Sequence, residues 1–190
     1  NYTALAMSLP HVGADGRHQV GGGEAQPDGV IGLIGPGTGL GVSGLVPGGD
    51  RWVTLATEGG HVSFAPTDER ELRVLQFAWK TMPRVSAERL LSGPGLELIH
   101  QALGGAAPLS AAQIVQRALD GDDPACGQTL DCFCGMLGTM ASDLALTLGA
   151  TFATAGCNAR EPGKQTVSTQ PAAGQPANPR VLIETSKGNI

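Results

Sequence analysis

The chain has 190 residues and a net charge of −5, and its positive side chains occur singly along the sequence. This distribution lacks the basic patch of a nucleic-acid-binding protein, and no apolar run approaches the length that crosses a bilayer. The four cysteines lack the spacing of a secreted disulfide framework, which favours a reducing, cytoplasmic location.

Apolar runs bounded by glycine and proline predict strands in the first third of the chain. Residues 30–34 (VIGLI) lie between glycines, which is typical of a buried strand. Two further runs, 42–46 (VSGLV) and 51–57 (RWVTLAT), flank the turn sequence PGGD. This turn chemistry predicts an antiparallel hairpin.

Helical periodicity replaces these runs after residue 66. Thr67 or Asp68 can cap a helix that extends to about residue 82. One face of this helix carries the apolar residues Leu72, Leu75 and Trp79. A short helix is expected to begin at Ser86, and longer helices are expected at residues 94–103, 111–119 and 126–148. Ser110 can cap the helix at 111–119.

The composition changes after Ala150. Between residues 153 and 180 the largest apolar side chain is Val167, and Pro, Gln, Gly, Ala, Thr and Ser dominate. Such a segment buries too little apolar surface to offset its ordering entropy. We therefore expect residues 153–180 to be disordered.

The glycine-rich string GPGTGLG at residues 35–41 is the first candidate binding element. It does not meet the dinucleotide fingerprint GxGxxG, because Leu40 or Val42 replaces the last glycine, depending on where the pattern starts. Exposed backbone N–H groups and a Thr hydroxyl in such a turn can form an anion nest for phosphate. The residues of this candidate phosphate site are Gly35, Gly37, Thr38 and Gly39. A plain hairpin loop is the alternative.

Cys132 and Cys134 could supply two ligands of a zinc site, but the sequence downstream lacks the second pair of ligands that zinc requires. Two residues apart on a helix, they point in different directions. We expect buried structural thiols, and no zinc.

A second candidate site lies in ATEGGHVSFAP, residues 56–66, where Glu58 and His61 flank a Gly-Gly turn. Glu88 follows at the start of a predicted helix. One His and two Glu suit a zinc site. They suit a polyol equally well, because carboxylates accept from vicinal hydroxyls and a neutral imidazole both donates and accepts. For Glu88 alone, a solvated acid at a helix N-terminus is the simplest interpretation.

Taken in order, three strings resemble the bacterial glucokinase family: GPGTGLGVSGLV, RWVTLATEGGHVSFAP and VSAERLLSGPGLELI. A long helix that ends in DLALTLGAT fits the family as well, so the resemblance extends over roughly residues 1–151. It implies an α/β fold, the large lobe of an actin-like ATPase, ribonuclease H-like, two-lobe sugar kinase. By this resemblance residues 1–11 are a remnant of the small lobe, 12–151 form the large lobe, and 152–190 form an atypical, disordered tail.

The resemblance also implies the ATP-dependent phosphorylation of glucose to glucose 6-phosphate, with Mg²⁺ as the accompanying ion. Glu58, His61 and Glu88 are then the residues that hold glucose hydroxyls, and the loop from Gly35 to Gly41 faces the phosphates of ATP. The oligomeric state stays open, with a homodimer among the options.

Two features depart from the family pattern. Counting back from Glu58 places the position of the family's catalytic Asp at Asn1. Alternatively, Asn1 is the Asn that precedes this Asp in the family, and the Asp itself is lost. Neither case leaves a carboxylate there. After Thr151 the family pattern continues with a strand and a glycine pair, and this sequence departs from that pattern. A shifted reading frame, a divergent splice or a genuine disordered tail would each produce such a departure. These departures favour an alternative for this chain, a non-catalytic sugar-binding remnant or regulator. A metallohydrolase built on the one His and two Glu is a third hypothesis.

Overall fold

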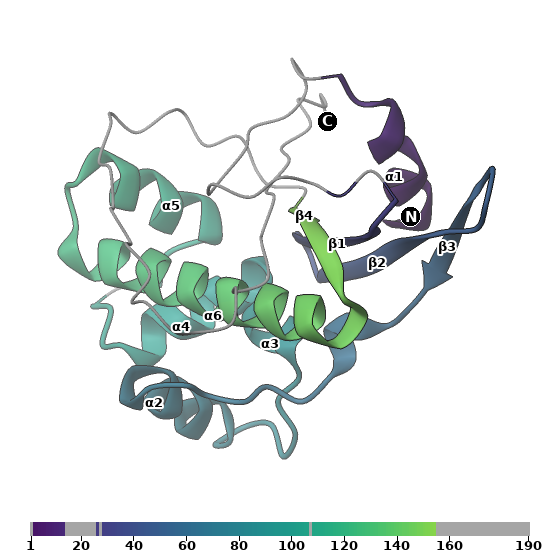
Figure 1. Ribbon diagram of the computed structural model, residues 1–190. Helices are drawn as coiled ribbons and strands as arrows, with labels where there is room; N and C mark the ends of the chain where they lie inside the picture. Colours follow the sequence, from purple (N-terminus) through teal and green to yellow (C-terminus); the bar gives the residue numbers. More distant parts are fainter. Residues whose placement is uncertain (1, 14–25, 27, 107, 155–190) are drawn as a thin grey trace, which may run out of the picture.

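A computed structural model describes residues 2–13, 26, 28–106 and 108–154 of the protein (Figure 1). The predictions made for Asn1 and for the tail beyond Thr154 lie outside these residues. Within the described residues, the molecule is a mixed sheet covered by helices on both faces.

The sheet has four strands in the order β3-β2-β1-β4. Its strands are β1 (Val30–Pro36), β2 (Leu40–Pro47), β3 (Trp52–Ala56) and β4 (Ala150–Thr154). The first three run antiparallel, and the predicted hairpin between β2 and β3 is confirmed by pairs from Ser43↔Ala56 to Pro47↔Trp52. Gly49, with φ of 81°, supplies the left-handed residue in the turn that joins them.

Strand β4 pairs with β1 in parallel, from Val30↔Ala150 to Ile34↔Thr154. A parallel neighbour needs a long crossover, which the helical segment between β3 and β4 provides. The regular structure therefore continues to Thr154, past the boundary predicted at residue 151, and the expectation that the chain leaves the sheet after Thr151 is wrong. Parallel pairing depends on backbone groups, so it forms although four of the five residues of β4 are Ala or Thr.

Most helices lie on one face of the sheet (Figure 1). They are α2 (Glu69–Ala78), α3 (Ala87–Leu90), α4 (Gly93–Ala102), α5 (Ala111–Asp120) and α6 (Pro124–Leu148). Helix α1 (Tyr2–Ser8) and the 3₁₀ turn η1 (Leu9–His11) cover the other face, and η3 (Gly59–His61) is a second 3₁₀ turn. Among the described residues, no helix combines the length and apolar character required to span a membrane.

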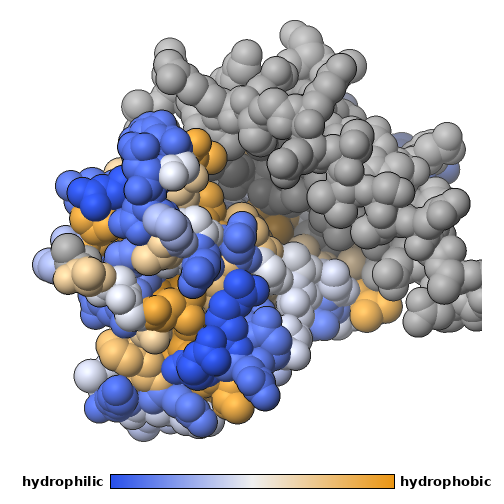
Figure 2. All heavy atoms as spheres, turned by 90° about the vertical axis from the view of Figure 1, so that its left-hand side faces the viewer, coloured by the Kyte–Doolittle hydropathy of each residue, from blue (hydrophilic) through white to orange (hydrophobic). Residues whose placement is uncertain are grey.

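Alternation along the strands places apolar side chains on both faces of the sheet. Leu33 and Leu45 face α1, where they pack with Ala6 and Leu9. The larger core lies beneath α2, α3, α4 and α6 and includes Ile34, Leu40, Val42, Val74, Leu90, Leu91, Ile99 and Met136. A third cluster, of Leu96, Ile114 and Cys126, joins α5 to α4 and α6. The outer surface of this helical layer mixes hydrophilic and apolar side chains (Figure 2).

Caps define where several helices begin. Asp68 accepts a hydrogen bond from the Glu71 backbone N–H at 2.7 Å, and Ser110 forms a capping box with Gln113, as predicted for both helices. Asp123 caps α6, which begins at Pro124, slightly before the predicted start. Each cap satisfies N–H groups that have no partner within the helix.

The predicted apolar face of α2 is partly wrong. Leu75 is buried, but Leu72 and Trp79 are 39% and 52% exposed. The buried face consists of Glu71, Val74, Leu75 and Ala78. Glu71 can be buried because its carboxylate accepts hydrogen bonds from both the backbone N–H and the hydroxyl of Thr67. The helix also ends at Ala78 rather than near residue 82.

Candidate active site

The Gly59-Gly60 pair allows the chain after β3 to fold tightly onto β2. Gly60 is buried and lies directly against the carbonyl oxygen of Leu40, so an added Cβ would collide with that backbone atom. A Cβ at Gly59 would lie 2.7 Å from the Val42 side chain. Only residues without a side chain fit here. The turn consequently presents its two flanking residues, Glu58 and His61, at the edge of the sheet.

A short antiparallel contact brings Glu88 to the same place. Phe64 N–H donates to the Val85 carbonyl at 3.0 Å, and Ala87 N–H donates to the Val62 carbonyl at 2.9 Å. Arg84 adds a hydrogen bond of 2.6 Å from its guanidinium to the His61 carbonyl. These bonds align the segment before α3 with the segment after η3, so the first turn of α3 faces the imidazole.

Glu58, His61 and Glu88 converge, although they come from different elements. His61 Nε2 lies 3.8 Å from Glu58 Oε2, and its Nδ1 lies 4.0 Å from Glu88 Oε1. The side chains of Glu58, His61 and Glu88 are 89%, 56% and 32% exposed. These distances confirm that the three side chains lie together, and their role in holding a sugar stays a prediction. Separations of this size leave the polar atoms accessible to a hydroxyl-rich ligand.

The glycine-rich loop lies beside this cluster. Its turn is closed by a hydrogen bond of 2.8 Å from Gly37 N–H to the Gly39 carbonyl. Gly37 and Thr38 are exposed, Gly39 is half-buried, and Gly35 is buried within β1. Gly35 accepts a hydrogen bond of 2.7 Å from the Tyr2 hydroxyl through its carbonyl. Of the four predicted phosphate-site residues, three therefore belong to the turn and Gly35 lies beneath it.

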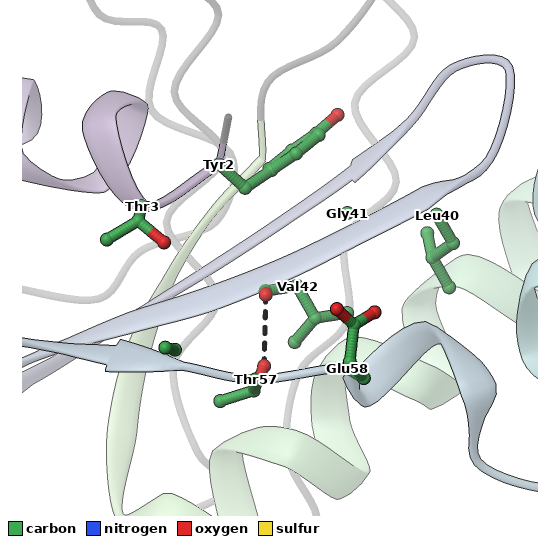
Figure 3. Close-up of a pocket in the computed structure, with 8 residues that line it drawn as sticks. Tyr2, Thr3, Leu40, Gly41, Val42, Thr57 and Glu58 are labelled. Atoms are coloured by element: carbon green, nitrogen blue, oxygen red, sulfur yellow. Dashed lines mark hydrogen bonds between the residues drawn. The ribbon is translucent and has the colours of Figure 1, made fainter.

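A cleft of about 300 Å³ opens next to Glu58, between α1 and the end of β3. Figure 3 shows Tyr2 and Thr3 on one side of it and Thr57 and Glu58 on the other. Thr57 is held by a hydrogen bond of 3.0 Å from its hydroxyl to the Val42 carbonyl. The sequence interpretation missed Tyr2, Thr3 and Thr57 as lining residues. Their positions next to Asn1 and Glu58 in the sequence were the available signal.

The cysteines of α6 are separate from this site. Cys132 is buried as predicted, whereas Cys134 is exposed, so the expectation of two buried thiols is wrong for Cys134. Nearly opposite helical faces account for the difference, because residues two apart on a helix are rotated by roughly 200° about its axis. Among the described residues, no group of three or more His, Cys, Asp or Glu is arranged to hold a metal ion.

Residues 1–154 match the family model described as Glucokinase. The chain is 53% identical over 156 residues to the "Bifunctional protein glk" of Paraburkholderia xenovorans, covering 79% of this chain and 24% of that protein. It is 51% identical over 155 residues to the glucokinase of Chromobacterium violaceum, covering 79% and 44% respectively. Among solved structures, a glucokinase from an Antarctic psychrotroph matches with a TM-score of 0.75 and 34% identity, over 82% of this chain and 51% of that one. The chain thus spans less than half the length of these two curated relatives. The predicted sugar-kinase fold is confirmed.

Proposed function

We propose that this chain, which belongs to the glucokinase family, is the part of a kinase that binds glucose and faces the phosphates of ATP. The reaction is phosphoryl transfer from ATP to the 6-hydroxyl of glucose. The observation that carries the proposal is the convergence of Glu58, His61 and Glu88 beside the glycine-rich turn.

The three side chains supply the chemistry that a sugar requires. Each carboxylate accepts hydrogen bonds from hydroxyls, and the imidazole between them donates through one nitrogen and accepts through the other when it is neutral. Glu88 is the least exposed of the three, so its hydrogen bonds meet the least competition from water. Orientation of the sugar in this way lowers the barrier by several kcal/mol, because the reacting groups are already positioned.

The exposed turn at Gly37 and Thr38 suits the phosphate side of the reaction. Phosphoryl transfer depends on positioning and on stabilising charge, and backbone N–H groups and a Thr hydroxyl provide both. Mg²⁺ accompanies the nucleotide through phosphate oxygens and water, and we assign it no ligand in this chain. Because the reaction draws on ATP, a cytoplasmic location belongs to the same proposal, as does a homodimer as one form of assembly.

The proton of the 6-hydroxyl needs an acceptor. The position of the family's base is Asn1 in this chain, or its Asp is lost, and an amide does not serve as a base. We therefore expect the 190-residue chain to show little turnover by itself in a coupled ATP and glucose assay. Turnover in the ordinary range of kinases, roughly 1–100 per second, would contradict this part of the proposal.

Glucose binding tests the proposal directly, since it needs no base. Titration calorimetry of the chain with glucose should give a measurable affinity that Glu88→Gln weakens by about 1.5–3 kcal/mol, the scale of a hydrogen bond to a charged group. Glu69→Gln is the matched control, because Glu69 is exposed at the start of α2, away from the site. Absence of glucose binding by the unsubstituted chain, or equal losses in the two variants, would refute the assignment.

A further inference from the structure

Glu88 contacts both halves of the candidate site. Its Oε1 lies 4.0 Å from His61 Nδ1, on the sugar side. Its Oε2 accepts a hydrogen bond of 3.1 Å from the backbone N–H of Leu40, the residue that follows the glycine-rich turn. We propose that Glu88 is a positioning residue that anchors the phosphate loop and couples its order to sugar binding. This inference rests on the proposed function for the identity of the two ligands.

The sequence of the loop provides room for this contact. A Cβ at Gly39 would lie 2.5 Å from Glu88 Oε2 and 3.1 Å from its carboxyl carbon, so any side chain there would displace the carboxylate. Gly39 does not have a positive φ, so its backbone conformation is open to other residues. The glycine is therefore needed for the approach of Glu88 and not for the shape of the turn.

The other end of the turn is held by the same stretch of chain. The Gly37 carbonyl accepts a hydrogen bond of 2.8 Å from the N–H of Gly93, the first residue of α4. Ser92 caps α4 by accepting from Gly95 N–H at 3.2 Å. Glu88 and Gly93 belong to adjacent helices that pack together, so one compact unit holds both sides of the turn. A displacement of the Glu88 carboxylate is then passed to the loop through the Leu40 hydrogen bond, while the Gly93 bond holds the other side of the turn.

A sugar hydroxyl that donates to the free oxygen of Glu88 fixes the carboxylate in the position that also binds Leu40 N–H. Sugar binding therefore favours the ordered loop, and the ordered loop favours sugar binding by the same factor, since coupling between sites is reciprocal. A substitution on the phosphate side that displaces Glu88 must then weaken glucose binding even when no nucleotide is present.

Two glycine-to-alanine substitutions test this coupling. Gly39→Ala displaces the Glu88 carboxylate, whereas Gly127 lies in α6, where a Cβ meets nothing within 4 Å, and has no positive φ. Glucose titration without nucleotide should show an affinity lower by roughly 5- to 150-fold for Gly39→Ala, the usual range of coupling between sites. Gly127→Ala should bind glucose as the unsubstituted chain does. Equal glucose affinities for Gly39→Ala and Gly127→Ala would overturn the inference.

A second measurement needs no ligand and keeps the inference separate from the proposed function. Amide hydrogen exchange of Leu40 should be faster by about tenfold or more in Glu88→Ala, because the N–H loses its charged acceptor. Glu88→Gln keeps an oxygen that can accept, so it should restore the protection of Leu40 while glucose affinity stays low. A protein that fails to bind glucose refutes the proposed function, whereas unchanged exchange of Leu40 in Glu88→Ala refutes the anchoring role.

Discussion

Replacement of Gly60 by alanine tests the physical reason for the glycine pair at the end of β3. The added Cβ would be forced against the carbonyl oxygen of Leu40. Leu40 is paired with Pro36 in the β1–β2 ladder, so its backbone cannot move away without disturbing the sheet. A side chain in the same place could rotate to another rotamer, but a backbone carbonyl has no such freedom.

The expected loss of stability follows from this contact. Overpacking of a close-packed site costs about 1–3 kcal/mol, and a rigid backbone obstacle places Gly60→Ala in the upper part of that range. Alanine also restricts the unfolded chain, which offsets about 0.4–1 kcal/mol of this loss in the free energy of unfolding. We expect a net decrease in the free energy of unfolding of about 2 kcal/mol, together with weaker glucose binding, because η3 carries His61.

Urea unfolding followed by circular dichroism measures the change, with Gly127→Ala as the control. Gly127 lies in α6, where a Cβ meets nothing within 4 Å, so alanine should stabilise the protein by up to about 1 kcal/mol through helix propensity. A Gly60→Ala midpoint equal to or above that of the unsubstituted chain would show that the turn tolerates a side chain, and the steric explanation would fail.

Three further predictions concern other parts of the fold. Tyr2→Phe removes the hydroxyl bond of 2.7 Å to β1 and should lower the free energy of unfolding by about 1 kcal/mol, and an unchanged urea midpoint would contradict it. Iodoacetamide should modify the exposed Cys134 well before Cys132, because Cys132 is buried and burial raises its pKa to about 11. Peptide mass spectrometry measures the two labelling rates, and equal rates would contradict this prediction. The pKa of Asp123 is lowered, chiefly by the hydrogen bond from Ala125 N–H, so its stabilisation is present above the unfolded pKa of about 3.9 and is lost as pH falls through the lower folded value. Asp123→Asn should therefore flatten the fall in stability below about pH 4, and identical pH profiles would exclude this role.

Local features of the sequence determined much of the architecture. The apolar run at 30–34 and the PGGD turn after β2 predicted strands and a hairpin because these signals act over a few neighbouring residues. Asp68 and Ser110 predicted helix starts for the same reason, since a cap bonds to a backbone group three residues away. The Glu58 and His61 pair could also be recognised, because both residues flank one short turn.

Contacts between distant segments were decided only by the tertiary structure. Leu72 and Trp79 have the spacing of a buried face, but packing against α4 and α6 selected the neighbouring face, where Thr67 satisfies the Glu71 carboxylate. The helical spacing is the same for either face, so it cannot specify which one meets the core.

The dual contact of Glu88 is of the same kind. The residue types indicated a polar site and glucose hydroxyls by resemblance, but nothing local to Glu88 points to the backbone N–H of Leu40. That contact exists because the chain after η3 pairs with the segment before α3, and because Gly39 leaves space for the carboxylate. Sequence determines which groups can bond, whereas the three-dimensional packing of separate elements determines which of those groups come within reach.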